Sequence, residues 1–129
     1  MPRAEHVKVI EAIADRFNSG SVDQLDELLA PGLRSFKRDL ATMRAAFPDA
    51  RFTIDDLIGE GDKLVDRFTI TGTHEGPFAG IGPTGRKVAL AGISVVRIDG
   101  ARVVERWGIS DQLGLLRQLG VLPANLARQ

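Results

Sequence analysis

Apolar and charged positions follow a helical period over the first third of the chain. Val7, Ile10, Ala14 and Phe17 recur at three- and four-residue spacing, and charged residues fill the positions between them. One face of this segment is therefore apolar and the other is polar. The pattern predicts an amphipathic helix that stops near Asn18-Ser19-Gly20.

Two more helices are expected before the first proline-aspartate pair. One starts at Ser21, where Ser21 and Gln24 have capping-box spacing, and it ends at Ala30-Pro31-Gly32. The other runs from about Ser35 to Phe47, where apolar residues again recur at helical spacing, and Pro48-Asp49 terminates it.

The period becomes strand-like after this point, because apolar residues now alternate with polar ones. Residues 76–85 contain four glycines and two prolines and are typical of a loop, whereas Asp99-Gly100 indicates a tight hairpin. The predicted strands begin at Arg51-Phe52-Thr53-Ile54 and then cover Leu64 to His74, Val88 to Ile98 and Arg102 to Ile109.

A last helix is predicted to begin at about Asp111. We expect Leu113, Leu116 and Leu119 to face the body of the protein, with Gly120 as the stop signal. The tail after residue 123 is expected to be loosely held.

Three helices followed by an antiparallel meander indicate an α+β fold. We expect a cone: a curved antiparallel sheet wrapped by three N-terminal helices around an apolar pocket, followed by a short C-terminal helix. No repeat or linker interrupts the sequence, so residues 1–129 are expected to form a single domain. The strands around Phe68 and Val95 carry apolar or β-branched residues on both faces. The face that does not cover the helices is therefore expected to pair with a second copy in a homodimer.

The amino-acid composition limits the functions that this chain can have. The formal net charge is zero and no basic stripe is visible, which argues against nucleic-acid binding. No run of eighteen apolar residues and no signal-peptide pattern is present, so we expect a cytoplasmic protein without a membrane span. The chain has no cysteine, no tyrosine and two histidines, so we expect neither a metal nor an organic cofactor. Polar chemistry must come from carboxylates, arginines, imidazoles, hydroxyls, amides or the single indole.

A series of short motifs follows in order along the chain: Ala46-Phe47-Pro48-Asp49, Gly61-Asp62 with Val65 and Arg67, Gly72-Thr73-His74-Glu75-Gly76, Phe78, Gly80-Ile81-Gly82-Pro83-Thr84-Gly85, Val104-Glu105-Arg106-Trp107, and Asp111 with Leu113-Gly114-Leu115-Leu116-Arg117-Gln118-Leu119-Gly120. In order and spacing they resemble the SnoaL-like polyketide cyclases, a branch of the nuclear-transport-factor-two-like superfamily that also includes the ketosteroid isomerases. The resemblance covers roughly two thirds of the chain.

The resemblance implies a cofactor-free enzyme that acts on a small hydrophobic carbonyl compound by intramolecular aldol-type ring closure or a proton shift. An aspartate at the position of Asp111 serves such cyclases as the acid/base. The residues alone leave a second interpretation open, because an aspartate between a strand and a helix is also a favoured N-cap. His74 is a candidate oxyanion donor, and it could equally be a residue that only hydrogen-bonds the following loop.

Two other functions stay open. Relatives that open epoxides use two aspartates and an arginine, which Asp66, Arg67 or Arg97, and Asp111 could supply. A non-catalytic binding module is the third possibility, because the segment after Pro31 is short and an arginine stands where the family often has histidine. Beyond Asp111 and His74, the candidate substrate contacts are Trp107, Arg106, Arg67, Phe68 and Phe47.

Overall fold

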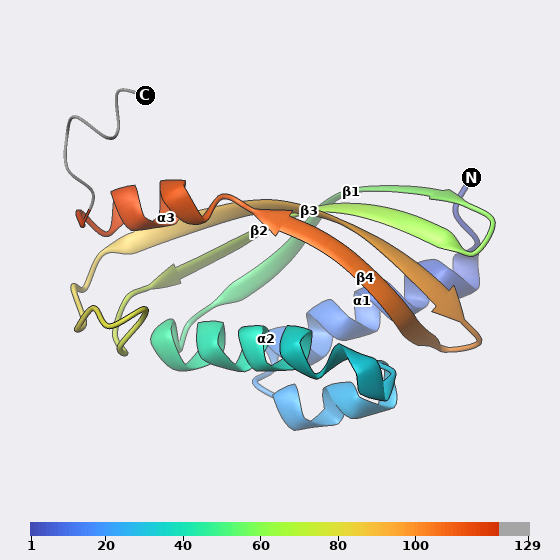
Figure 1. The fold of residues 1–129 in the computed structure, drawn as a ribbon, viewed down its shortest axis with the longest axis horizontal. Helices are drawn as coiled ribbons and strands as arrows, with labels where there is room; N and C mark the ends of the chain where they lie inside the picture. The colour runs from blue at the N-terminus through green and yellow to red at the C-terminus, as the bar shows by residue number, and fades with distance from the viewer. Residues whose placement is uncertain (122–129) are drawn as a thin grey trace.

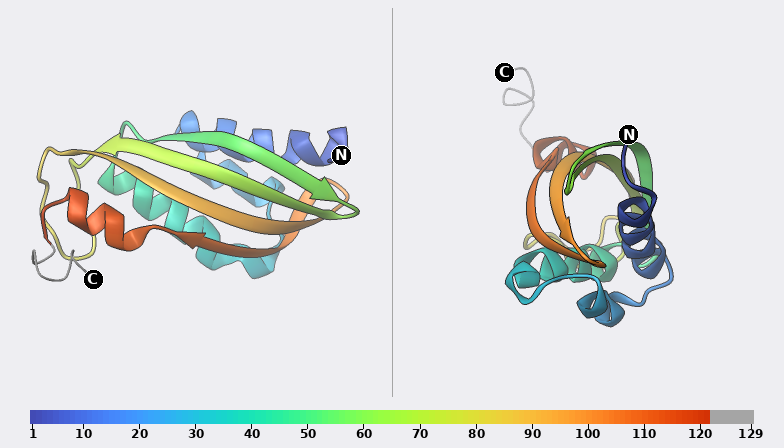
Figure 2. Two further views of the ribbon diagram at one scale, coloured as in Figure 1. Left: turned by 90° about the horizontal axis from the view of Figure 1, so that it is seen from above. Right: turned by 90° about the vertical axis from the view of Figure 1, so that its right-hand side faces the viewer.

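A computed structural model describes residues 1–121 and builds them around one four-stranded antiparallel sheet. Its strands pair in sequence order, as a meander: β1 (Arg51–Glu60), β2 (Lys63–Thr73), β3 (Lys87–Asp99) and β4 (Arg102–Ser110). The sheet is long and strongly curved, and viewed end-on it bends into an arc (Figure 2). The predicted α+β class and curved antiparallel sheet are confirmed. The expectation about the tail after residue 123 lies outside the described residues.

Side chains of the central strands alternate between the two faces of the sheet, as the strand period requires. On β2 the buried positions are Leu64, Asp66, Phe68 and Ile70, and the intervening residues are exposed or half-buried. We call the face that carries these four residues the concave face, and the opposite one the convex face. The N-terminal helices lie along the concave face (Figure 1), and the core forms between these helices and the sheet.

Two α-helices cover the concave face: α1 (Ala4–Asn18) and α2 (Arg34–Ala46). The predicted apolar stripe of α1 is confirmed at Ile10, Ala14 and Phe17, which are buried. The Arg44 guanidinium fixes the C-terminal end of α2, because it donates to the backbone carbonyls of Phe17, Pro48 and Ala50. One side chain thus ties both helices to the start of the sheet.

The segment between these helices differs from the prediction. In place of a helix from Ser21 to Ala30, the chain forms two short 3₁₀ helices, η1 (Val22–Glu27) and η2 (Pro31–Leu33). The predicted capping box at Ser21 is wrong, since its side chain makes no capping hydrogen bond.

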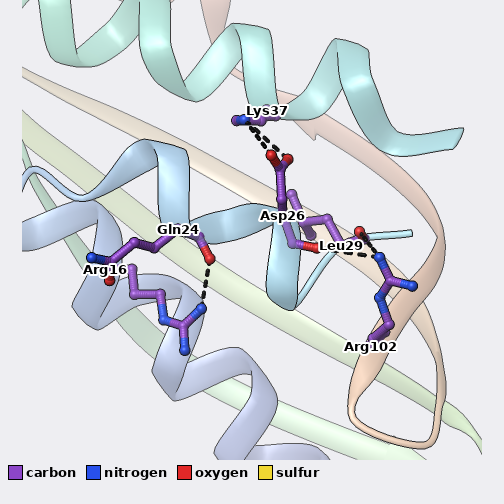
Figure 3. Close-up of polar contacts among 6 residues, drawn as sticks. All are labelled: Arg16, Gln24, Asp26, Leu29, Lys37 and Arg102. Atoms are coloured by element: carbon purple, nitrogen blue, oxygen red, sulfur yellow. Dashed lines mark hydrogen bonds and ion pairs between the residues drawn. The ribbon is translucent and has the colours of Figure 1, made fainter. Parts of the chain in front are cut away.

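Backbone pairing with β4 explains this difference. The Leu28 carbonyl accepts from Val103 N at 2.8 Å, and Ala30 N donates to the Val103 carbonyl at 2.9 Å. Arg102 Nη2 donates to the Leu29 carbonyl at 2.9 Å (Figure 3). These groups are therefore taken by the edge of the sheet and are not free for an α-helical ladder. A helix prediction from local period could not anticipate this competition.

The last helix, α3 (Gln112–Gln118), continues directly from β4. It shields the edge of β3 that β4 leaves unpaired, where the Gln118 amide exchanges two hydrogen bonds with the backbone of Ala89, at 2.7 and 2.9 Å. The buried residues of α3 are Gly114 and Leu115. Leu119, the C-cap residue that follows the helix, is also buried, so its predicted inward position is confirmed. Leu113 is 48% exposed and Leu116 is only half-buried. The prediction that these two residues face the body of the protein was therefore wrong.

Candidate functional site

A cavity of about 370 Å³ lies between the concave face and α2. Its size falls within the range of small-molecule sites in proteins. Aromatic and aliphatic side chains form most of its wall, and Asp39, Thr42, Arg106, Ser110 and Gln112 add polar groups. The apolar part of the lining consists mainly of Phe36, Leu40, Met43, Phe52, Phe68 and Ile70.

Strand register places a row of polar groups across the concave face. Asp66 on β2 is paired with Ser94 on β3, and Ser94 is paired with Gly108 on β4. Ser94 Oγ donates a hydrogen bond to Asp66 Oδ1, and both residues are buried. Gly108 has no side chain, and the guanidinium of Arg106 occupies the space above it: a methyl group built on Gly108 would lie 2.5 Å from Arg106 Nη1.

Two neighbours pack against the half-buried Arg106 guanidinium. The Phe36 ring centroid lies 4.0 Å from Arg106 Cζ, and the missing side chain of Gly108 leaves room for the same group. Burial lowers the pKa of Arg106, while the charges of Asp66 and Asp39 oppose that shift. Arginine remains charged even so, because its ordinary pKa is above 12. A permanent cation is therefore fixed on the wall of an apolar cavity.

The Asp66 carboxyl is on the same concave face, next to Ser94 of the neighbouring strand. Burial raises its pKa, whereas the Ser94 hydrogen bond and the Arg106 charge act in the opposite direction. A second cavity of about 20 Å³ is lined by Asp66, Ser94 and Arg106 and shares Phe36 and Phe52 with the larger one. Asp66 lines only the smaller cavity, whereas Arg106 lines both, so the fixed cation lies between the buried carboxyl and the larger cavity.

Asp111 lies apart from that cavity. It is the N-cap of α3, and its Oδ1 accepts from Gly114 N at 2.8 Å. The residue is exposed and borders a shallow depression on the convex face, together with Arg67, Ile93 and Ile109. The structure thus exhibits the capping role that its position allowed, and the assignment of Asp111 as acid/base stays a prediction.

His74 is fully buried at the end of β2. Its Nδ1 lies 2.9 Å from Thr84 Oγ1 and accepts from Thr84 N at 3.2 Å, which anchors the glycine-rich loop. Its ring packs against Phe47 with centroids 5.5 Å apart. Neither His74 nor Phe47 is among the residues that line the main cavity, although Phe78 from the anchored loop is.

The four other predicted substrate contacts are divided equally between the concave and convex faces of the sheet. Phe68 and Arg106 line the main cavity, and Phe68 stacks on Phe52 with centroids 5.0 Å apart. Trp107 is 51% exposed on the convex face, and Arg67 is exposed there with an ion pair to Asp55 at 3.8 Å. The cavity thus includes two of the predicted substrate contacts.

Sequence reasoning gave too little weight to Asp66 and passed over Ser94 and Asp39. A usable signal was present, because Asp66 stands in phase with Leu64, Phe68 and Ile70 on β2. A carboxylate in the middle of an apolar alternation is placed on the buried face by its period alone. Buried carboxyls are rare unless they are paired or functional, so that position was a site candidate.

Residues 1–121 contain neither a cluster of metal ligands nor a helix that could span a membrane. Within these residues no three His, Cys, Asp or Glu side chains gather closely enough to hold a metal ion. Among the helices of the same part of the chain, none has the length and apolar character needed to cross a bilayer.

Comparison with known proteins gives a consistent family. The family model described as SnoaL-like polyketide cyclase matches residues 7–119. TsrD from Streptomyces laurentii is 31% identical, with a TM-score of 0.85 over 95% of this chain and 99% of that one. IdmH, a candidate polyketide cyclase from Streptomyces antibioticus, is 30% identical with a TM-score of 0.78 over 90% and 99%. AclR, a candidate hydroxylase from Streptomyces galilaeus, is 25% identical with a TM-score of 0.85 over 93% and 98%. No curated protein sequence matches this chain.

Proposed function

Because the chain belongs to the SnoaL-like polyketide cyclase family, we propose that it closes a ring in a small hydrophobic carbonyl compound bound in the cavity of the concave face. The family match and the similar structures support a cyclase-type function. In our proposal Asp66 is the acid/base and Arg106 stabilises the oxygen on which negative charge develops. The observation that carries the proposal is the buried Asp66–Ser94 pair beside the enclosed Arg106 guanidinium.

The proposed reaction is an intramolecular aldol addition. The Asp66 carboxylate removes a proton from the carbon next to a carbonyl, and the electrons of that C–H bond delocalise onto the carbonyl oxygen. The resulting carbon nucleophile attacks a second carbonyl carbon, which forms the new C–C bond and leaves an alkoxide. Asp66 returns the proton to that oxygen. No oxidant, reductant or further reactant enters, which supports a cofactor-independent enzyme.

The environment of Asp66 suits a proton carrier. General acid–base catalysis works best when the pKa of the group lies close to the working pH. Burial raises the pKa of Asp66 from the ordinary range of a carboxyl toward neutrality. In the low dielectric of the cavity the Arg106 charge acts on a developing oxyanion more strongly than it would in water.

Asp111 is the alternative acid/base. The family resemblance supports it, whereas its exposure and its hydrogen bond to Gly114 support a capping role. His74 as an oxyanion donor likewise stays a prediction, because the contacts of its ring anchor the loop through Thr84.

Matched variants can show which of the two aspartates, Asp66 or Asp111, is the acid/base. A suitable probe is 1-phenyloctane-1,5,7-trione, whose ring closure and loss of water give a conjugated enone that absorbs in the ultraviolet. We expect Asp66→Asn to lower the turnover of this probe by about 10²–10⁴-fold, the usual contribution of a general base. We expect Asp111→Asn to retain the turnover, because asparagine caps a helix about as well as aspartate. The reverse result would transfer the role to Asp111.

A specific observation favours epoxide opening as a second candidate. The charges of two carboxylates, Asp66 and Asp39, both act to raise the pKa of Arg106. This set differs from the expected one, which consisted of Asp66, Arg67 or Arg97, and Asp111. The cavity of about 20 Å³ beside Asp66 has the volume that one water molecule needs. In this mechanism Asp66 would deprotonate a water that attacks the epoxide carbon, the C–O bond at that carbon would break, and Asp66 would pass the proton on to the released oxygen. Styrene oxide in ¹⁸O-labelled water tests it, because labelled diol should form with the wild type and not with Asp66→Asn.

The cavity weighs against a non-catalytic binding module. A closed, apolar or absent pocket would favour such a module, whereas this cavity of about 370 Å³ carries Asp39 and Arg106 on its wall.

A further inference from the structure

The loop between β2 and β3 is fastened to the helix that covers the main cavity. It lies beside the C-terminal end of α2 (Figure 1), where Glu75 N and Gly76 N both donate to the Ala46 carbonyl at 3.0 Å. Gly76 passes so close to this helix that a methyl group built on it would lie 2.3 Å from the Ala45 carbonyl oxygen. Only a residue without a side chain allows this approach, so the loop is held at a fixed distance from α2.

A tight turn at the tip of this loop holds Phe78 against the cavity. Phe78 and Ile81 exchange two backbone hydrogen bonds, at 2.9 and 2.8 Å. Between them, Ala79 and Gly80 have φ values of 50° and 79°, as in the type I′ turns of tight hairpins. A positive φ is unfavourable for alanine and persists only where the surrounding structure imposes it. The Phe78 ring centroid lies 5.8 Å from that of Phe47 and the residue lines the cavity, so the loop contributes a fixed aromatic wall.

Phe78 and Arg106 lie toward opposite ends of the cavity. Arg106 is paired with Val96 on β3, and Leu90, which lines the cavity nearer the loop, is about 20 Å from Val96 along the strand. Phe78 belongs to the loop that precedes this end of β3. A ligand whose reactive carbonyl lies at Arg106 is therefore limited at its far end by the Phe78 ring.

His74 fixes the other arm of the loop. Its backbone N–H donates to the Arg86 carbonyl at 2.9 Å, and its carbonyl accepts from Gly85 N at 2.8 Å. Its ring Nδ1 accepts from Thr84 N at 3.2 Å, so the proton of the neutral imidazole is on Nε2. Within residues 1–121 this Nε2 is buried and has no hydrogen-bond partner. The contact that the ring makes through its nitrogens in this part of the chain is thus the one to Thr84.

We propose that His74 is a positioning residue that acts through Thr84 to hold the loop, and that Phe78, as the end wall of the cavity, sets the longest ligand that binds there. The nitrogen that matters is Nδ1, whereas an oxyanion donor would have to use the N–H of Nε2. The proposal rests on the proposed function for the use of the cavity, but it can be tested by binding alone.

The first test measures how affinity depends on ligand length. The probes are n-alkyl phenyl ketones from acetophenone to octanophenone, titrated into the full-length protein in a calorimeter. Each methylene that becomes buried should raise the affinity by about fourfold, until the ligand meets Phe78 and the gain stops. We expect Phe78→Ala to extend the gain to longer chains. Ile81→Ala, in the same turn but outside the cavity wall, should keep the limit of the wild type. The absence of a limit in the wild type, or the same limit in Phe78→Ala, would overturn the proposal.

Matched variants of His74 separate its two nitrogens. The Oδ1 atom of asparagine lies close to the position of histidine Nδ1, whereas the side-chain amide of glutamine reaches the position of Nε2. We therefore expect His74→Asn to keep the length limit and His74→Gln to lose it, with no additional effect of His74→Gln in the Phe78→Ala background. Thr84→Val removes the hydroxyl and should weaken the limit as well, so it carries the same test if His74→Gln does not fold. A limit that survives in both His74→Gln and Thr84→Val would show that His74 does not position the wall.

Turnover of the trione probe separates this proposal from the cyclase reaction. A displaced wall weakens the binding of substrate and transition state alike, so His74→Gln should raise KM several-fold and leave kcat unchanged. A loss of kcat by about 10²–10³-fold in His74→Asn with retention in His74→Gln is the pattern of an oxyanion donor, and it would refute the positioning role. If the wild type does not turn over the trione while the length limit depends on Phe78 and His74, the cyclase proposal fails and the assignment of the wall stands.

Discussion

The concave and convex faces of the sheet are built from the same strands yet offer different chemistry. Arg106 and Trp107 are neighbours on β4, but Arg106 is half-buried and packs against Phe36 while Trp107 is 51% exposed. Asp66 and Arg67 on β2 divide in the same way: Asp66 is buried, and Arg67 pairs with Asp55 in solvent. The position of a charged residue along the strand thus decides whether its side chain faces the core or the solvent.

The same comparison applies to the apolar residues. On the concave face they form the core and the cavity, whereas on the convex face Ile58, Ile93, Trp107 and Ile109 are exposed. The α-helices α1 and α2 cover the first set, and within residues 1–121 the second set has no cover of comparable size (Figure 1). This contrast is the reason why we propose catalysis on the concave face and predict association through the convex face.

The largest expected effect distinguishes the two arginines. We predict that Arg106→Gln lowers the turnover of the trione probe by about 10²–10³-fold, the typical loss when one group that stabilises an oxyanion is removed. Arg67→Gln is the matched control and should leave turnover unchanged, because the Arg67–Asp55 pair is on the convex face. Equal losses in the two variants would show that the faces do not differ in the way we propose.

The next prediction tests the convex face as an interface. We expect the wild type to form a homodimer through this face and Ile109→Glu to weaken it by tenfold or more, since an unpaired charge at an interface costs about 2–5 kcal/mol. Ala101→Glu, in the exposed β3–β4 hairpin, is the control and should not change the association. Sedimentation velocity measures both variants. A wild type that sediments as a 14.0 kDa monomer at micromolar concentration would contradict the prediction.

A third prediction concerns the pH dependence of stability on the concave face. Burial raises the pKa of Asp66 above the value of about 3.9 expected in the unfolded chain, so the folded state binds this proton more tightly. The stability from this group is fully present below about pH 4 and is lost as the pH rises through the folded pKa. The difference in unfolding free energy between wild type and Asp66→Asn should therefore shift in favour of the variant from pH 4 to pH 8. Urea titrations at several pH values measure it, and a difference independent of pH would contradict the burial effect.

The smallest expected effect is at the cap of α3. Asp111→Ala should lower the unfolding free energy by about 1 kcal/mol, and Asp111→Asn should change it little, because asparagine caps nearly as well. Thermal melts of the two variants provide the comparison. If both variants lose the same stability, the hydrogen bond to Gly114 is not what stabilises the helix start.

Local pattern was sufficient for the α+β class and the order of the sheet, and it placed the strands well. It was insufficient for the segment between α1 and α2, where β4 takes the backbone groups of Leu28 and Ala30. It also gave the wrong inward face for α3, because that helix buries Gly114 and Leu115 while Leu113 is exposed. Both failures arise from contacts with elements far away in the sequence, which no local period encodes.

What the sequence determined by itself is the type and order of the elements, since helix and strand periods, glycine turns and proline stops act within a few residues. It also determined that Arg106 and Trp107 occupy opposite faces, because the strand period leaves no other arrangement. Only the tertiary structure decided which face is the interior, and hence that Asp66, Ser94 and Arg106 gather there from three different strands. The burial that raises the pKa of Asp66, and the enclosure of the Arg106 guanidinium, come from side chains packed around them after the sheet curves and the helices close over it.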